Sequence, residues 1–119
     1  MPNGIDMTRY LEAGLRGASH RQSLIANNLA NLDTPGYRRT DTAFEKALAD
    51  ALTDGKPAGD DDDLVFIPGT TPVRENGNDV DLDTEVGEMV KNSAQYKTYI
   101  RLLGRVYRQM DLAMRDSNI

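Results

Sequence analysis

The sequence predicts a mainly α protein. We expect an elongated, coiled-coil-like antiparallel pair of long N- and C-terminal helices, with a short middle helix and an irregular, partly extended acidic loop region. Apolar residues recur at heptad spacing near both chain ends, whereas the middle is acidic and interrupted by Pro and Gly. The 119 residues suit one domain. It would comprise an N-terminal core helix (1–33), a turn, short helix and acidic region (34–82) and a C-terminal core helix (83–119).

Residues 4–32 have the pattern of an α-helix, with Asn3 expected as its N-cap. The expected core-facing positions alternate in steps of four and three, which predicts a narrow heptad seam. They are Leu11, Leu15, Ala18, Gln22, Ile25, Leu29 and Leu32. Residues 34–37 fit a type II turn, because Pro35 fixes φ at the second position and Gly36 accepts a positive φ at the third.

Residues 42–52 are predicted to form a short second helix. Phe44, Leu48 and Leu52 recur every four residues on one face, and Thr42 and Glu45 match a capping box. Residues 53–80 are predicted to be mostly loop. Within them, residues 64–67 fit a short strand, and a second extended piece is expected around residues 72–73.

Residues 83–115 are predicted to form a long helix capped by Asp83. Its seam would comprise Val86, Met89, Ser93, Tyr96, Ile100, Leu103, Tyr107, Met110 and Met114, beside a second apolar stripe of Tyr99, Leu102, Val106 and Ala113. Such a helix is roughly 50 Å long, whereas a compact domain of this size is only about 35 Å across. We therefore expect the overhang to pair with the first helix or to be covered by other subunits.

The charge is unevenly distributed. The net charge of −5 divides into +1 over residues 1–49, −9 over residues 50–85 and +3 over residues 86–119. This balance argues against nucleic-acid binding. No apolar run approaches the roughly 18 residues of a membrane span, and the first residues lack the basic and apolar regions of a cleavable secretion signal. Leu, Ile, Val and Phe make up only 21% of the chain, so apolar surface for a core is scarce.

Catalytic and metal-binding chemistry finds little support. The chain has no Cys, and His20 is its one His, which excludes disulfides, thiolate catalysis and a two-His site. The alternating acids of residues 79–83 resemble the start of a calcium loop, but Thr84 and Val90 stand where that loop needs Gly and Glu. We therefore expect no enzyme, no metal and no cofactor. A hydrolase built on a carboxylate pair is a remote alternative, because no apolar pocket is evident to raise a carboxylate pKa.

The most specific segment is residues 26–38, ANNLANLDTPGYR. Three Asn near a helix end are unusual, because Asn is a poor helix former. We expect the amides of Asn27, Asn28 and Asn31 to hydrogen-bond within or between subunits near the turn; a simple helix cap is the plainer alternative.

The same segment resembles the signature of the flagellar basal-body rod and hook family, close to ANN-[IL]-AN-x-x-TPGY-[KR]. Leu32 and Asp33 stand at its two variable positions, where the family commonly has Val-Asn or a similar pair, which is a conservative departure. Residues 76–83, NGNDVDLD, followed by a long helix with Tyr96 and residues 102–103, resemble the proximal members of that family, with a second short rod protein as the near alternative. The resemblance covers essentially the whole chain, and the middle loop is its least characteristic part.

This resemblance implies a structural protein. Members stack as a helical tube that transmits torque, with their terminal helices in its inner core. The implied partners are other rod proteins, copies of the same chain, the inner-membrane ring or its adaptor, and the type III export apparatus. The implied location is the rod in the periplasmic space, reached without a cleavable signal. A soluble coiled-coil adaptor or chaperone of a flagellar or type III secretion system is the alternative.

We expect the assembly interface to combine the seams with the turn. Across the helix pair, Leu11, Leu15, Ile25 and Leu29 are expected to face Ile100, Leu103, Tyr107 and Met110. The expected interface also includes Asn27, Asn28, Asn31, Thr34, Pro35, Gly36, Tyr37, Arg38 and Tyr96.

Overall fold

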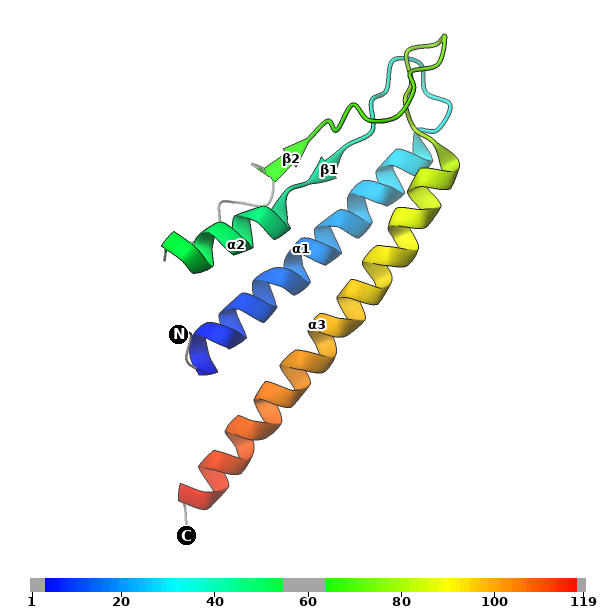
Figure 1. Ribbon diagram of the computed structural model, residues 1–119. Coiled ribbons are helices and arrows are strands. Elements are labelled where there is room, and N and C mark those ends of the chain that lie inside the picture. Colours follow the sequence, from blue (N-terminus) through cyan, green and yellow to red (C-terminus); the bar gives the residue numbers. More distant parts are fainter. Residues whose placement is uncertain (1–3, 55–63, 118–119) are drawn as a thin grey trace.

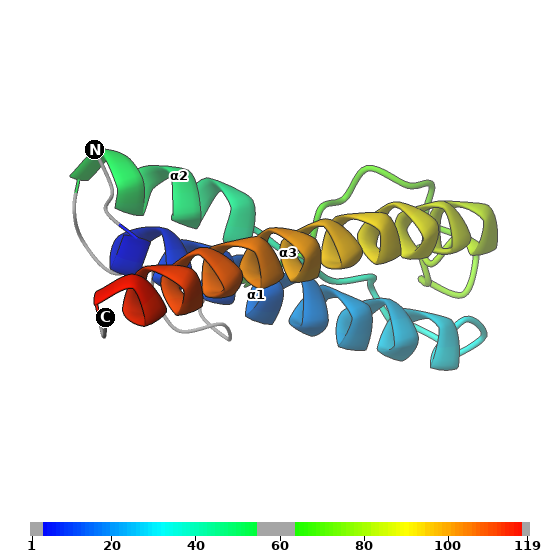
Figure 2. The ribbon, with the colours of Figure 1, turned by 90° about the horizontal axis from the view of Figure 1, so that it is seen from below.

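The computed structural model describes residues 4–54 and 64–117. In chain order its elements are α1 (Gly4–Ala30), β1 (Asp41–Thr42), α2 (Phe44–Asp54), β2 (Val65–Phe66) and α3 (Leu82–Ser117). Figure 1 shows α1 and α3 side by side in opposite directions, with α2 packed against α1. The two long helices cross each other when the molecule is viewed from below (Figure 2). The principal extents are 69 × 27 × 16 Å, which confirms the predicted elongated helical fold.

The predicted elements lie close to the observed ones. All three helices are confirmed to within two residues at each end. The predicted strand at residues 64–67 contains β2, which pairs antiparallel with β1 in the register Asp41 to Phe66 and Thr42 to Val65. Residues 72–73 form no strand in the described part of the chain. The expected cap Asn3 lies outside the described residues.

Two predicted helix caps are wrong. The cap of α3 is Asp81 rather than Asp83, because the Asp81 carboxylate accepts bonds from the Thr84 backbone N–H at 3.0 Å and hydroxyl at 2.7 Å. At the start of α2, Glu45 does not complete a capping box. Its carboxylate instead accepts a bond from the guanidinium of Arg21.

The seam between α1 and α3 is rotated from the predicted one. On α1 the prediction is right for Leu11, Ala18 and Ile25, which are buried. The intervening predicted positions are only half-buried, and their neighbours one residue earlier, Gly14, Arg21 and Asn28, are buried in their place. On α3 the buried positions are Glu85, Asn92 and Leu103. Of these three, only Leu103 belongs to the predicted seam. The other two are polar, and they can be buried because they hydrogen-bond to groups of α1.

The register of the helix pair also differs from expectation. Asn28 bonds to Glu85 and Tyr107 bonds to Glu12, so residues 25–29 lie opposite the start of α3. The prediction that Ile25 and Leu29 face residues 100–110 is therefore wrong. Sequence periodicity fixes which positions share a face, but it leaves the sliding of one helix along the other undetermined.

Two glycines of α1 allow close packing. A Cβ at Gly14 would lie 2.3 Å from Cε1 of Tyr99, and one at Gly17 would lie 2.2 Å from Cδ2 of Phe44. These contacts adjoin the small apolar core of Ala18, Phe44 and Leu48, with Tyr10, Ala13, Leu64 and Tyr99 around it. Within the described ranges, no helix is both long and apolar enough to cross a membrane.

Candidate assembly site at the turn and the helix pair

The turn after α1 packs directly onto the loop before α3. Gly36 has φ +76°, and the Tyr37 N–H donates to the Thr34 carbonyl at 3.3 Å, as expected for a type II turn. The Gly36 N–H donates to the carbonyl of Asn76 at 2.8 Å. Gly77, at φ +84°, approaches so closely that a Cβ there would lie 3.3 Å from the Gly36 Cα. The two segments therefore meet backbone to backbone.

Asn28 connects α1, the turn segment and α3. Its amide nitrogen donates to the Thr40 carbonyl at 3.0 Å and to both carboxylate oxygens of Glu85 at 3.2 Å. Its amide oxygen accepts from the Tyr37 hydroxyl and the Thr40 N–H, each at 3.0 Å. This fully buried amide thus uses its donor and acceptor sides together. It brings together two of the predicted site residues, Asn28 and Tyr37.

Two buried carboxylates bind the two arginines of the turn segment. Glu85 accepts a bond from Nε of Arg39 at 2.5 Å, with both side chains at most 5% exposed. Asp79 accepts from the Arg39 backbone N–H at 2.6 Å and from Nε of Arg38 at 2.9 Å. Burial raises the pKa of Asp79, but these hydrogen bonds and the two positive charges outweigh it, so the pKa is lowered overall. Burial also disfavours the charged form of Arg39 and by itself would lower its pKa. The hydrogen bond and charge of Glu85 outweigh this effect, so the pKa of Arg39 is raised.

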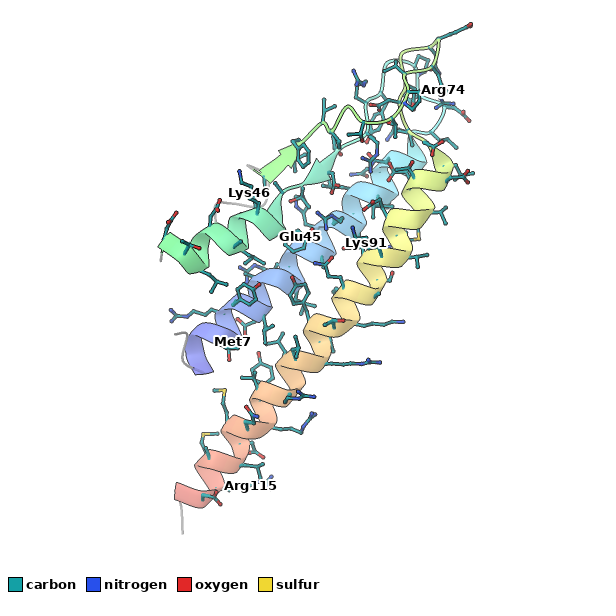
Figure 3. All side chains as sticks on the ribbon, in the orientation of Figure 1. Met7, Glu45, Lys46, Arg74, Lys91 and Arg115 are labelled. Atoms are coloured by element: carbon teal, nitrogen blue, oxygen red, sulfur yellow. The ribbon has the colours of Figure 1, made fainter. Side chains whose placement is uncertain are left out.

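Asn78 caps the end of α1 from the opposite segment. Its amide nitrogen donates to the carbonyls of Asn31 and Thr34, both at 2.8 Å, and its oxygen accepts from the Val80 N–H at 2.7 Å. Helix C-termini leave carbonyls without partners, and this side chain satisfies two groups at that end. The guanidinium of Arg74 donates to the Leu32 carbonyl nearby. Figure 3 places Arg74 at the end of the molecule where these loops meet.

These interactions define one polar cluster. It comprises Asn28, Tyr37, Arg38, Arg39, Asn78, Asp79 and Glu85. A buried hydrogen-bonded network in which each charge is paired fixes geometry strongly, because breaking one partner leaves another unsatisfied. The cluster connects the end of α1, the turn segment and the start of α3. Its hydrogen bonds and ion pairs can hold α1 and α3 in one fixed relative position.

The other two asparagines of the motif serve local roles. The Asn31 amide donates to the Asn27 carbonyl at 2.8 Å and accepts from the Thr34 hydroxyl at 3.1 Å. Asn27 is exposed and contributes its backbone carbonyl. Thr34, Pro35 and Gly36 are also exposed. Of the three amides, that of Asn28 is the one buried at the centre of the contacts.

The remaining predicted site residues divide by exposure. Leu11, Ile25 and Leu103 are buried within the single chain, and Leu15 and Leu29 are half-buried. Four others are exposed by 37–47% and form what we call the apolar stripe of α3: Tyr96, Ile100, Tyr107 and Met110. The Tyr107 hydroxyl donates to Glu12 at 2.8 Å, and the Thr8 hydroxyl lies 3.9 Å from the Met110 sulfur. The stripe is thus held at its edge against α1 while its surface faces solvent.

Sequence reasoning missed several central residues. Arg39, Asn78, Asp79, Glu85 and Asn92 were not among the predicted interface residues, yet all are buried. Asn78 and Asp79 belong to the NGNDVDLD segment, which was the available signal. Asn92 donates to the Ala18 carbonyl at 2.8 Å and gave no local signal.

A second ionic group joins α1 to α2. Arg21 donates to the Asp41 carboxylate at 2.9 Å and to the Thr42 carbonyl at 2.8 Å, and its guanidinium lies 4.8 Å from the centroid of the Phe44 ring. Among the described residues, no group of three or more His, Asp or Glu could hold a metal ion.

Comparison with known proteins places the sequence among flagellar rod proteins. Residues 11–38 match the family model described as Flagella basal body rod protein. The chain is 32% identical over 101 residues to the flagellar basal body rod protein FlgB of Bacillus subtilis, a match that covers 76% of this chain and 78% of that protein. It is 29% identical over 129 residues to FlgB of Escherichia coli, covering 92% and 94%. With FlgB of Borreliella burgdorferi the identity is 26% over 131 residues, covering 90% and 91%.

These similarities do not favour the adaptor or chaperone alternative. The matched motif contains Asn28 and Tyr37, which meet in the polar cluster. The chain belongs to the flagellar basal body rod protein family and is a structural subunit of the rod.

Proposed function

We propose that this subunit assembles through α1 and α3 into the proximal part of the rod, where a helical tube of subunits transmits torque for motility. The observation that carries the proposal is the apolar stripe of α3, which stays exposed in the single chain. Covering apolar surface contributes about 25 cal/mol per Å², so neighbouring subunits that bury the stripe stabilise the assembly. The proposed neighbours are copies of the chain and other rod proteins.

The end of α3 adds to this surface. Met110 lies near Thr8, so the last turns of α3 run past the start of α1, as Figure 1 shows. Leu112 and Met114 there are 57% and 61% exposed. A helix end with large exposed apolar side chains suits contact with another subunit.

Torque transmission requires helices that keep a fixed relation within each subunit. The polar cluster supports this role, because it ties the end of α1 to the start of α3 through the Asn28 amide and through two ion pairs whose carboxylates, those of Asp79 and Glu85, are buried. We further propose export through the type III apparatus without a cleavable signal, a periplasmic location, and contact with the inner-membrane ring or its adaptor.

The test is a pair of substitutions on α3. Replacing Ile100 by Asp places a charge on the exposed stripe and is expected to abolish rod assembly while changing the monomer's unfolding free energy little. Leu103→Asp is also expected to abolish assembly, but it buries a charge in the seam as well. Leu52→Asp, at an equally exposed apolar position of α2, is the matched control. Motility and basal-body images of a deletion strain carrying each variant provide the readout. Normal motility with Ile100→Asp would contradict the proposal.

Cell fractionation tests the location independently. A rod subunit is expected to co-purify with basal bodies, whereas an adaptor would stay in the cytosolic fraction. Recovery of the wild-type chain in the cytosolic fraction alone would contradict the proposal.

A further inference from the structure

One stretch of α3 carries only positive charge. Residues 89–110 contain five cations and no Asp or Glu. Four of them, spaced four, four and three residues apart, form what we call the basic strip: Lys97, Arg101, Arg105 and Arg108. All four are exposed, and within the described part of the chain none of them has an ion-pair partner.

The basic strip faces away from α1. Asn92 and Leu103 mark the side of α3 that contacts α1. At about 100° per residue, the strip positions lie within about 50° of the side of the helix opposite the midpoint of Asn92 and Leu103. Figure 3 shows long nitrogen-tipped side chains projecting from this outer side of α3. Like charges three and four residues apart on a helix repel one another, so a partner of opposite charge would stabilise the strip.

The same chain carries the complementary charge at one end. In residues 31–37 and 70–84, Arg74 is the one cation. Beyond Asp79, which is paired with Arg38, these segments hold four exposed carboxylates. We call these the acidic end: Asp33, Glu75, Asp81 and Asp83. Arg74 forms an ion pair with Asp33 at 3.8 Å and also lies near enough to Asp81 to attract it, but one cation among four carboxylates leaves an excess of negative charge facing solvent.

We infer that the basic strip of one subunit binds the acidic end of a second copy of this chain. The inference rests on the proposed assembly of copies and specifies which surfaces meet. Complementary charge patches attract partners and fix their relative position. A contact between two different patches of identical chains is heterologous, so it can repeat along a helical assembly.

The positions of the two patches set the stagger between copies. Asp83 precedes Lys97 by 14 residues and Arg108 by 25 residues on the same helix. At 1.5 Å per residue these separations are about 21 and 37 Å. A second copy in the same orientation, displaced by about 20–40 Å along α3, therefore places its acidic end beside the basic strip.

Cross-linking tests this contact directly, because the chain contains no Cys. We would mix Glu75→Cys and Arg105→Cys chains with a short thiol-specific bifunctional cross-linker. The matched control replaces Arg105→Cys with Arg16→Cys, which alters an exposed arginine of α1 outside the strip. The mixed dimer is expected to exceed the control at least threefold at low ionic strength and to fall to the control level in 0.5 M salt. Equal yields from the two mixtures would overturn the inference.

Charge reversal provides the second arm. In sedimentation velocity at low ionic strength, Arg101→Glu/Arg105→Glu is expected to weaken self-association at least about tenfold, because like charges then meet. Arg9→Glu/Arg16→Glu changes the net charge equally and is expected to leave association near the wild-type level.

Mixing the strip variant with Glu75→Lys/Asp83→Lys is expected to restore association. Equal weakening by the strip and control variants, or no restoration on mixing, would overturn the inference. In either case the Ile100→Asp experiment still decides the proposed function separately.

Discussion

The two ends of α3 lie in opposite environments. At its start, Glu85 and its partners in the polar cluster are buried and hydrogen-bonded within one chain. At its far end, Met110, Leu112 and Met114 are apolar and 40–61% exposed. Polar groups are inside and apolar groups outside, the reverse of the usual distribution. The difference means that contacts within the chain fix one end, and it supports the proposal that neighbouring subunits cover the other.

This contrast explains the low apolar content of the sequence. A small core of Ala18, Phe44 and Leu48 is supplemented by ion pairs and amide bonds rather than by more apolar burial. Buried ion pairs contribute less to net stability than their Coulomb attraction suggests, but removing one partner is costly. The single chain is therefore held by buried polar contacts at one end and leaves apolar side chains exposed at the other.

The largest expected effect comes from the polar cluster. Glu85→Ala leaves the charge of Arg39 buried without its partner and is expected to lower the free energy of unfolding by about 3–5 kcal/mol. Urea denaturation of the purified chain measures it. Glu75→Ala, an exposed carboxylate at the same end, should change stability little. Equal losses of unfolding free energy in the two variants would contradict the claim that the buried cluster stabilises this end more than its exposed carboxylates do.

Asn28 is expected to matter next. Asn28→Ala abolishes the amide's bonds to Tyr37, Thr40 and Glu85. The expected loss is about 1–3 kcal/mol for each buried group left unsatisfied. Asn27→Ala is the matched control, because that neighbouring side chain is exposed. Similar melting temperatures for the two variants would show that the motif's amides are interchangeable, contrary to the structure.

A smaller effect is expected from pH. The pKa of Asp79 is lowered in the folded chain, so its ionised form stabilises folding at pH values above its ordinary pKa of about 3.9. That stability is lost as the pH falls through the lowered folded-state pKa. The difference in unfolding free energy between wild type and Asp79→Asn should therefore be constant from pH 7 to about 5 and shrink below about 4. A difference that grew on acidification would contradict the assigned direction.

The smallest effect on stability is expected at the far end of α3. Leu112→Asp should change the unfolding free energy of the monomer by less than about 0.5 kcal/mol, because Leu112 is 57% exposed. Rod assembly, scored by motility, should nevertheless be impaired. A large loss of monomer stability would mean that this end is already packed in the single chain.

The sequence predicted the helices well for a physical reason. Helical periodicity and the turn at residues 34–37 are local, so the three helix spans and the positive φ of Gly36 follow from neighbouring residues. The type II turn was predicted because Pro and Gly restrict and permit particular backbone angles. The strand at residues 65–66 was likewise marked by a short apolar run.

The rotation of α3 and the polar cluster could not be predicted in the same way. Periodicity counted apolar residues, whereas Glu85 and Asn92 are buried because Asn28 and Ala18, more than 50 residues away, supply partners. Arg39 and Asp79 meet only after the two loops close on each other. Ile100 was assigned to the seam between α1 and α3, yet it is 47% exposed.

Native-state hydrogen exchange of the isolated wild-type chain tests the central claim most directly. The amides of Asn28, Arg39 and residues 85–92 are expected to be the most protected, whereas those of residues 108–117 should exchange orders of magnitude faster. In assembled rods, protection should extend to the end of α3. Uniform protection along α3 in the monomer would contradict the account.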